Sequence, residues 1–422
     1  MRSSLFNYFD NRIYYGWVIL GVAVFGLLGS GPGQSHTFSV FLKPIGRDLG
    51  ISATALATAY GLATLAASFG LPYLGRMVDR HGPRRMLIIV VVMLGLSCLL
   101  FAGSLNFFWL AVGFGALRFL GQGALGLNCT YMVSQWFDRK RGFAISLMAL
   151  GFALSMAIHP PLSQWLIDLW GWRAAWLVLG LSTWILLLPP ILLLVYDKPE
   201  DVGRRPDGDL APTAGGAAEA APIQGIDLKS ALRTPAFYII AAGLFTLSML
   251  VTCLHFYQVS IFSEQGLSTR TATSVFAVSA TSMVIAMPLL GRMLDRFATH
   301  FVFIGGLLIM AAALVSAALV ETIVGALVYA VIFGVNNACT MTFFGYMWPR
   351  YFGRRYLGSV QGAGQMVGVF GASLGPILLG IAVQALGRYD VVLMASAILP
   401  VCCVVAALFL RPPSLSEKEG MS

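Results

Sequence analysis

The chain has 422 residues, of which 58% are hydrophobic and 11% charged, with a formal net charge of +9. Soluble globular proteins carry about 25% charged residues, so this composition excludes an ordinary soluble enzyme and indicates a membrane protein. The positive charge would suit a nucleic-acid-binding protein only if it formed one basic patch, and its distribution along the chain argues against that.

Apolar runs of about 20 residues, the length that crosses a bilayer as a helix, occur twelve times along the chain. Their Gly-, Ala- and Leu-rich sequences lack the alternation of barrel strands, so we predict an all-α membrane protein. The first run is too long and too rich in glycine for a cleaved signal peptide. The predicted spans are residues 14–41, 53–74, 86–104, 106–135, 142–166, 172–195, 235–262, 269–290, 300–320, 323–349, 357–386 and 389–410.

The lysines and arginines predict the orientation of these spans. With both termini placed inside, inner loops and tails hold 21 of the 27 basic residues, outer loops hold 5, and Arg118 lies within a span. This asymmetry follows the positive-inside rule. We therefore predict a multi-pass protein of the inner (plasma) membrane with cytoplasmic termini, in contact with the lipid bilayer and not with nucleic acid.

A polar stretch without hydrophobic periodicity predicts a cytoplasmic linker at residues 196–234. It separates two halves of six spans each, residues 1–195 and 235–411, and residues 412–422 form a cytoplasmic tail. The halves share a motif at a constant offset of 216 residues, which indicates parallel repeats related by an axis along the membrane normal. Its members are Gly75, Arg76, Asp79 and Arg80, which recur as Gly291, Arg292, Asp295 and Arg296.

The run GRMVDRHGPRR, residues 75–85, resembles the inner-loop signature of the major facilitator superfamily, and the copy from Gly291 resembles its second-half counterpart. The stretches SVFLKP, QWFDRKRGFAISLMALG and PEDVGRRPDGD are similar to the monocarboxylate transporter and oxalate/formate exchanger branch. The resemblance implies the major facilitator fold, with twelve transmembrane helices in two pseudo-symmetric halves. It also implies a secondary active transporter without a cofactor, which we expect to be a monomer.

The resemblance assigns the repeated motif to a cytoplasmic gate that locks the two halves while the pore faces outward. Glycine suits close backbone approach, and an acid near a helix end can accept hydrogen bonds from arginines or from a neighbouring helix N-terminus. The alternative is that the arginines only set the orientation. The predicted gate residues are Gly75, Arg76, Asp79, Arg80, Gly82, Arg84, Gly291, Arg292, Asp295 and Arg296.

All 18 carboxylates lie in loops, in tails or at helix margins, so no acidic proton relay is predicted within the spans. Arg118 lies about twelve residues into the fourth span, near the bilayer middle, where a charge costs at least about 2.5 kcal/mol. It is a candidate anchor for an anionic substrate, a residue that couples through helix packing, or a cation held by carbonyls and by Gln122. The stretch RFLGQG resembles the fourth-helix signature of the superfamily.

His36 and His255 occupy matching positions in the first and seventh spans, which line the central cavity in the resembled fold. Because histidine changes charge near neutral pH, the pair is a candidate proton handle that binds a carboxylate when protonated. Helix-packing histidines are the alternative. His159 precedes two prolines, and its ring could satisfy a backbone carbonyl that they free.

Further candidate substrate or coupling residues are amides and tyrosines within the spans, which can equally bond neighbouring helices. No nucleotide-binding, metal-binding or catalytic motif is recognised, so an enzyme is not expected. The remaining candidates are Gln34, Asn128, Tyr257, Tyr329, Asn336, Asn337, Gln361 and Gln365.

The predicted function is transport of a small organic anion, preferably a monocarboxylate, by alternating access, with protons as the candidate coupling ion. Export of drug-like amphipathic compounds is the alternative. The eighth span lacks the cation typical of monocarboxylate and oxalate carriers, and the eleventh lacks the lysine of the dianion exchanger. Oxalate is therefore not the expected substrate.

Overall fold

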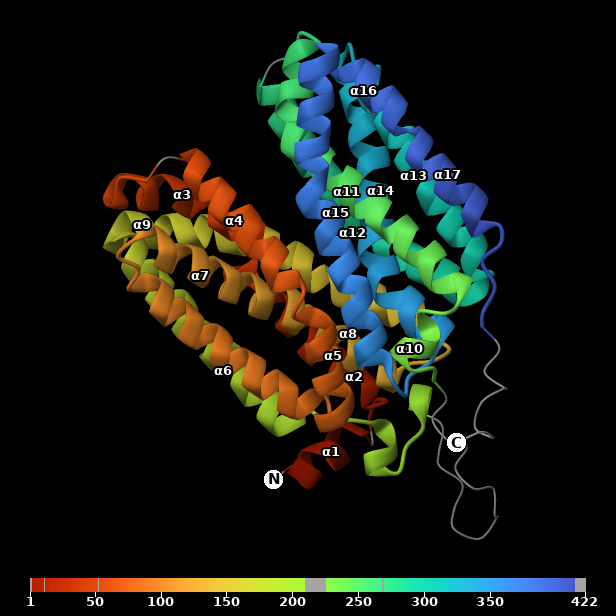
Figure 1. Cartoon of the computed structure of the whole chain (residues 1–422). Helices are drawn as coiled ribbons and strands as arrows, with labels where there is room; N and C mark the ends of the chain where they lie inside the picture. The colour runs from red at the N-terminus through yellow and green to blue at the C-terminus, as the bar shows by residue number, and fades with distance from the viewer. Residues whose placement is uncertain (1, 11, 52, 209–224, 268, 414–422) are drawn as a thin grey trace. The chain divides into compact units, whose positions relative to one another are not determined.

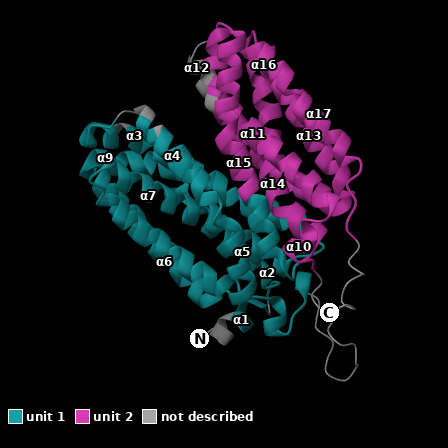
Figure 2. Ribbon diagram, in the orientation of Figure 1, with its two compact units in different colours: residues 1–224, 354–365 teal, residues 225–353, 366–422 magenta. Residues whose placement is uncertain are grey.

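The computed structural model describes residues 2–10, 12–51, 53–208, 225–267 and 269–413. Within these residues the elements are helices, and an isolated β-bridge joins Gly225 and Gly353. The chain divides into two compact units (Figure 2). Unit 1 comprises residues 1–224 and 354–365, and unit 2 comprises residues 225–353 and 366–422. Residues 354–365 belong to the predicted second half of the sequence, yet in the structure they are part of unit 1.

Unit 1 is a helical bundle that begins with the short helix α1 (Figure 1). It also contains the first turns of α15. Its own elements are α1 (Arg2–Asp10), α2 (Gly16–Leu28), the 3-10 turn η1 (Gly31–Gly33), α3 (Ser35–Leu49), α4 (Ala53–Ser68), α5 (Leu71–His81), α6 (Pro83–Ala102), α7 (Phe107–Leu117), the π-helix η2 (Arg118–Ala124), α8 (Leu125–Trp136), α9 (Arg141–Leu194), and the 3-10 turns η3 (Pro199–Val202) and η4 (Pro206–Gly208).

Unit 2 is a second helical bundle. Two of its long helices begin at threonine caps, where Thr234 accepts from the Phe237 N–H and Thr322 accepts from the Gly325 N–H. Such caps satisfy amides that have no partner inside the helix. Its elements are α10 (Leu228–Ala231), α11 (Pro235–Glu264), α12 (Thr269–Arg296), α13 (Thr299–Ala318), α14 (Ile323–Phe352), α15 (Leu357–Leu386), α16 (Tyr389–Ser396) and α17 (Ile398–Ala407).

The twelve predicted spans all fall on helical segments, and nine helices in the described residues are long and apolar enough to cross a membrane. Nine is fewer than twelve partly because α9 contains both of the predicted spans 142–166 and 172–195. Gly171, at φ 79° and ψ 167°, interrupts α9 between them. That conformation is open to glycine and breaks the helical path, so α9 is two helices joined at a kink.

Two predicted spans are interrupted by glycine and proline. The span 14–41 breaks at the Gly-Pro-Gly sequence that forms η1 between α2 and α3. The span 53–74 breaks after α4, and α5 restarts at Leu71 with Pro72 in its first turn, where a proline removes no helical hydrogen bond. Interrupted backbone leaves carbonyl groups free to bond side chains.

The repeated motif is helical over most of its length, whereas the sequence suggested a turn. Residues 75–81 form the last turns of α5, and the chain turns only at Gly82, with φ +78°. The copy from Gly291 likewise lies in α12, which ends at Arg296. Residues four apart share a helix face, so Gly75 and Asp79 point the same way.

The first part of the predicted linker is structured. Residues 196–208 contain η3 and η4, and α10 precedes α11. The Ala- and Gly-rich stretch 211–222 lies outside the described residues, as do residues 414–422 of the predicted tail.

An aromatic cluster around Trp176 packs α3, α6 and α9 together in unit 1. The fully buried indole lies 4.7 Å from the Phe41 ring and 4.8 Å from the Phe101 ring, between centroids. Phe114 of α7 lies 5.2 Å from Phe101. Large rings of this kind contribute much of the buried apolar area of a core. The cluster packs α3, which carries His36, against the part of α9 that follows the kink at Gly171.

Two glycines allow η1 to lie against the π-helix η2. A Cβ atom on Gly33 would lie 2.4 Å from the Leu117 carbonyl oxygen and 2.6 Å from the Gly121 Cα. A Cβ atom on Gly121 would lie 2.7 Å from the Gly33 Cα. Interiors are packed too tightly to admit a side chain at such distances. The close approach brings the backbone of η1 to Arg118, the first residue of η2.

Replacing Gly33 with alanine is expected to lower the apparent melting temperature of the purified protein in detergent. The added methyl group would meet backbone rather than a flexible side chain, and overpacking of this kind costs about 1–3 kcal/mol. The matched control is Gly21→Ala in α2, where a Cβ atom meets nothing within 4 Å. The control should leave the melting temperature unchanged or raise it. An unchanged melting temperature for Gly33→Ala would contradict the packing of η1 on η2.

Candidate functional site

Arg118 is buried in unit 1, and its guanidinium is held by neutral groups. Nη1 donates to the Gly33 carbonyl at 3.0 Å, and Nε donates to the Thr64 hydroxyl at 3.2 Å. Its Cζ lies 5.1 Å from the centre of the Tyr60 ring, and the residue is 7% exposed. A π-helix widens one helical turn and often occurs at functional sites, which agrees with the position of Arg118 at the start of η2.

The charge of Arg118 is not neutralised by these contacts. In the part of the chain that the structure describes, no carboxylate forms an ion pair with it. Gly33 and Thr64 take two of the five guanidinium N–H groups. A buried cation without a counter-ion is strongly unfavourable. The arrangement therefore favours binding of an anion.

His36 of α3 and His159 of α9 are joined through one hydroxyl group. His36 Nε2 lies 3.2 Å from Ser155 Oγ, which in turn lies 3.2 Å from His159 Nδ1, and the ring centroids are 6.5 Å apart. His159 Nδ1 also lies 3.2 Å from the Ser155 carbonyl oxygen. The His159 ring thus contacts Ser155, and not the carbonyls of Met156 and Ala157, four and three residues before the first proline, which the two prolines free. The interpretation made from the sequence is corrected in this respect.

The predicted amides of α2–α8 mostly bond to nearby backbone or side chains. Gln34 Nε2 donates to Ser30 Oγ at 3.0 Å beside the break at η1. Asn128 Nδ2 donates to the Ala124 carbonyl at 2.8 Å, and its buried Oδ1 has no hydrogen-bond partner among the described residues. Gln122, on η2, is half-buried. Gln34 and Asn128 therefore support the irregular backbone around Arg118.

Gln361, in the first turns of α15, differs from the other amides. It is fully buried, and neither its nitrogen nor its oxygen has a hydrogen-bond partner among the described residues. Gln365, one turn later, is half-buried. Leaving a buried amide unbonded costs about 1–3 kcal/mol, so among the predicted amides Gln361 is the strongest candidate to receive a polar ligand group.

His255 of unit 2 lies among aromatic rings. Its ring centroid is 4.7 Å from that of Phe333 and 6.1 Å from that of Phe276. The Tyr329 hydroxyl donates to Gln258 Oε1 at 3.4 Å. His36 and His255 belong to different units, and their pairing across a cavity stays a prediction.

The other candidates of unit 2 bond within that unit. The Tyr257 hydroxyl donates to the Pro376 carbonyl at 2.9 Å, linking α11 to α15. Asn337 Nδ2 donates to the Phe333 carbonyl at 3.0 Å, and Asn336 Nδ2 lies 3.1 Å from the Met310 sulfur. These contacts suit helix packing, whereas Arg118, His36 and His159 all lie in unit 1.

Asp79 of the predicted gate binds the N-terminus of α15. Its carboxylate accepts hydrogen bonds from the N–H groups of Gly358 and Ser359, each at 2.8 Å, and from the Ser359 hydroxyl. A Cβ atom on Gly75 would lie 1.9 Å from the Gly358 carbonyl oxygen, so the helices touch along their backbones. Burial raises the pKa of the Asp79 carboxyl, and the three donors oppose that effect. Carboxylates are favoured at helix N-termini.

Of the two partners predicted for Asp79, arginines or a neighbouring helix N-terminus, the structure shows the helix N-terminus. Among the described residues no ion pair joins Asp79 to an arginine of the motif. Arg76 and Arg80 are exposed, with Arg76 over the Tyr73 ring. Arg84 instead donates from its side chain to the Leu192 carbonyl at 3.0 Å and from its backbone to Asp197 at 2.9 Å. Gly82 lies beside this same contact, since its Cβ would clash with Asp197. In α12, Gly291 is buried, Arg292 and Arg296 are exposed, and Asp295 is half-buried.

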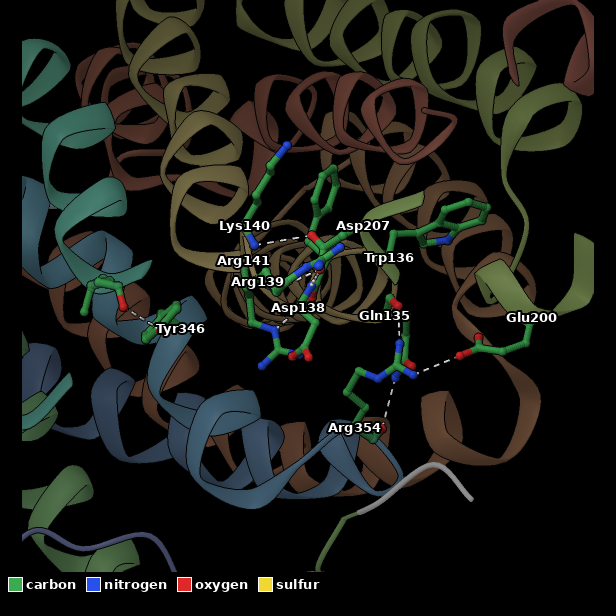
Figure 3. A network of polar contacts seen from close by, with 12 residues as sticks. Gln135, Trp136, Asp138, Arg139, Lys140, Arg141, Glu200, Asp207, Tyr346 and Arg354 are labelled. Carbon is green, nitrogen blue, oxygen red and sulfur yellow. Dashed lines mark hydrogen bonds and ion pairs between the residues drawn. The ribbon is translucent and has the colours of Figure 1, made fainter. Parts of the chain in front are cut away.

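Asp207, in η4 of the linker, caps the start of α9 (Figure 3). Its carboxylate accepts hydrogen bonds from the N–H groups of Asp138, Arg139 and Lys140, at 3.1, 2.7 and 3.3 Å. Asp207 is the only non-glycine residue with a positive φ among the described residues, at 62°. A strained backbone persists where its surroundings over-determine it. Here the three amides and the adjacent Arg139 guanidinium hold the Asp207 carboxylate, and so keep the backbone in this conformation.

A second linker residue reaches the start of α15. Glu200 accepts from the Arg354 side chain at 2.9 Å, and Arg354 also donates to the Gln135 carbonyl (Figure 3). Gln135 Nε2 returns a hydrogen bond to the Arg354 carbonyl at 3.0 Å. Arg204 pairs with Asp10 of α1. The linker therefore ties α1, α8 and the segment before α15 together within unit 1.

The sequence analysis missed several partners of the site. Thr64 and Tyr60 lie four residues apart in α4 and both contact Arg118, and Ser155 lies four residues before His159. An i, i+4 spacing places residues on one helix face. That spacing was visible in the sequence, but nothing local shows which helix the face meets.

A family model for the Major Facilitator Superfamily matches residues 18–263 and 256–421. The chain is 26% identical over 409 residues to the 4-hydroxybenzoate transporter PcaK of Pseudomonas aeruginosa, covering 88% of this chain and 87% of that protein. It is 27% identical over 197 residues to the Monocarboxylate transporter 11 of Homo sapiens, and the match covers 47% of this chain and 42% of that protein. The chain thus spans less than half of some matched relatives.

The crystal structure of the Escherichia coli fucose:proton symporter FucP matches with a TM-score of 0.68. The match covers 94% of this chain and 98% of that chain, at 14% sequence identity. At this identity the likeness concerns the fold.

Asp79→Asn is expected to loosen the contact between α5 and α15, because the amide lacks the charge that strengthens the bonds to Gly358 and Ser359. Hydrogen bonds to charged groups contribute about 1.5–3 kcal/mol. Hydrogen–deuterium exchange of the peptide that spans residues 354–365 should become faster. Asp138→Asn, which removes the exposed partner of the Arg141 ion pair, is the control and should leave that peptide unchanged. Equal protection in wild type and Asp79→Asn would contradict the contact.

Two substitutions of Asp207 distinguish the effect of losing its carboxylate from the effect of its positive φ. Asp207→Gly and Asp207→Ala both remove the acceptor for three amides, so both should lower the apparent melting temperature. Asp207→Ala should lower it further, since a left-handed backbone costs a non-glycine residue about 1–2 kcal/mol. If Asp207→Gly melts at the wild-type temperature, the carboxylate does not hold the linker on α9.

Proposed function

The chain belongs to the Major Facilitator Superfamily, and from that premise we propose that it is a secondary active transporter of a small organic anion, preferably a monocarboxylate. The family and the matched relatives are transporters and not enzymes. The protein is an integral membrane protein, and we propose that it lies in the inner (plasma) membrane as a monomer with cytoplasmic termini. Alternating access between the two halves would carry the substrate across.

The single observation that carries this proposal is the buried Arg118 guanidinium without a carboxylate partner in the described residues. Its unused N–H groups can donate to both oxygens of one carboxylate, which is the ligand geometry that arginine suits best. One fixed positive charge matches one negative charge, which favours a monoanion over a dianion. Gln361 offers a further donor and acceptor for polar groups of the substrate.

The names of two relatives point in the same direction. One is described as a 4-hydroxybenzoate transporter and the other as a monocarboxylate transporter, and each name describes a molecule with a single carboxylate. Proton coupling is part of the proposal. Its support is the presence of two hydrogen-bonded imidazoles in unit 1.

The contact of Asp79 with α15 supports a gate that opens and closes during transport. The carboxylate binds neutral amides and one hydroxyl, which can be released without separating an ion pair. We propose that this contact holds one state of the transport cycle. We propose a gate role in the second half only because the motif of the first half recurs there, at Gly291, Arg292, Asp295 and Arg296.

A thermal-shift screen of the purified protein tests the proposal. The panel comprises 4-hydroxybenzoate, lactate, oxalate, a neutral sugar and a lipophilic cation, each at two pH values. Binding stabilises the folded state by an amount that grows with ligand concentration over Kd. Stabilisation by the two monocarboxylates supports the proposal. Stabilisation only by the lipophilic cation would overturn it in favour of export of amphipathic compounds.

Arg118→Gln is expected to weaken monocarboxylate binding about 100-fold, because the loss of a buried charge partner costs about 2–5 kcal/mol. Arg118→Lys should weaken it less, since lysine keeps the charge but not the fork of donors. Isothermal titration with the carboxylate from the screen measures both. Arg85→Gln, at an exposed position in the first turn of α6, is the control. Wild-type affinity in Arg118→Gln would contradict the role of this residue.

A further inference from the structure

One hydroxyl group serves two imidazoles in unit 1. Ser155 Oγ lies 3.2 Å from His36 Nε2 and 3.2 Å from His159 Nδ1. A hydroxyl carries a single hydrogen and two lone pairs, so it can donate to at most one of the two rings and accepts from the other ring or from both. The protonation states of His36 and His159 are therefore linked through Ser155.

The surroundings of His159 determine which groups donate and which accept between His36, Ser155 and His159 when both imidazoles are neutral. Its Nδ1 also lies 3.2 Å from the Ser155 carbonyl oxygen, which can only accept. Nδ1 therefore carries the hydrogen, and the Ser155 hydroxyl is left to donate to His36 Nε2. In this arrangement a proton that arrives at the site binds the lone pair of His36 Nε2, which faces Ser155 Oγ.

Proton binding then reverses the donor order. His36 Nε2–H donates to Ser155 Oγ, and the hydroxyl hydrogen turns to another acceptor, for which a serine within a helix has the carbonyl four residues earlier. His36 is half-buried, whereas Ser155 and His159 are buried. Protons therefore enter and leave through His36, and His159 holds the hydroxyl in place.

The charges around the pair limit it to one proton. Among the described residues of unit 1, His159 on α9 and Arg118 on η2 act electrostatically on His36, and Tyr60 on α4 donates to the adjacent Ser35 and lies by Arg118. Asp48, at the far end of α3, is engaged with Arg173. With Arg118 permanently positive, a second imidazolium would add repulsion between like charges.

The corresponding histidine of the repeat has different surroundings. His255 packs against the rings of Phe276 and Phe333, whereas His36 contacts a hydroxyl that leads to a second imidazole. The two halves thus share the histidine but not the hydrogen-bonded chain. An arrangement found in one half suits a single transported proton.

We propose that His36, Ser155 and His159 form the binding site of one co-transported proton, with Ser155 as the positioning residue. The inference rests on the proposed transport of a monocarboxylate. The bound proton adds a positive charge near Arg118 and so strengthens binding of the anion, and loss of the anion weakens binding of the proton. Anion and proton therefore bind and leave together, as thermodynamic linkage requires.

The first test follows each histidine directly by exchange of its ring C2 hydrogen, measured by mass spectrometry on the full-length protein across a pH series. Ser155→Ala should shift the titration midpoints of His36 and His159 by about one pH unit, because each ring loses a hydrogen-bond partner. Ser146→Ala is the matched control, since Ser146 is also buried in α9 and donates to the Gly142 carbonyl. His300, in unit 2, serves as the internal reference. Unchanged midpoints in Ser155→Ala would overturn the shared site.

The second test measures uptake of 4-hydroxybenzoate and of lactate into proteoliposomes as a function of pH. Ser155→Ala and His159→Gln should move the pH of half-maximal uptake in step with the His36 midpoint, and Ser146→Ala should not. Shifted histidine midpoints with an unmoved uptake profile would overturn the transport role of the proton site. If the wild-type protein transports a carboxylate and Ser155→Ala behaves like wild type in both tests, the proton site is contradicted and the proposed function is not. Failure of wild type to bind any carboxylate in the thermal-shift screen instead defeats the proposed function.

Discussion

A buried guanidinium that has no counter-ion among the described residues is the constraint around which unit 1 is organised. Each group that reaches Arg118 is neutral: a carbonyl from η1, a hydroxyl from α4 and the face of a tyrosine ring. The carbonyl is free because the helix breaks at Gly-Pro-Gly, and the break can approach because Gly33 and Gly121 lack side chains. Neutral dipoles lower the free energy of a buried charge only in part. What remains is attraction for an anion, which is the basis of the proposed substrate class.

The two units carry the same repeated motif but differ in their polar chemistry. Unit 1 gathers Arg118 and two hydrogen-bonded histidines, and unit 2 places His255 against phenylalanine rings and uses its amides between helices. Sequence repetition preserves helix positions because packing and membrane crossing depend on them. It does not preserve side-chain chemistry, which a carrier needs at only one position along the path.

Two carboxylates of unit 1 connect segments that are distant in sequence by accepting from backbone amides at helix starts. Asp79 binds the first turn of α15, and Asp207 binds the start of α9. The partial positive charge at a helix N-terminus favours both contacts. Glu200 and Arg354 add an ion pair between the same linker and the segment before α15. The predicted linker therefore contributes to the structure of unit 1 through residues 196–208, while its Ala- and Gly-rich part lies outside the described residues.

Sequence alone determined which segments are helices, where Gly-Pro-Gly interrupts the first of them, and that Arg118 lies inside a span. These properties depend on composition and on neighbours a few residues away. Tertiary structure alone decided that Ser155 lies between His36 and His159, that Asp79 meets Gly358, and that Asp207 caps α9. Their partners lie 119, 279 and 68 residues apart in the chain. No local periodicity specifies such a partner, because the pairing depends on how whole helices pack and on which backbone amides their ends leave free.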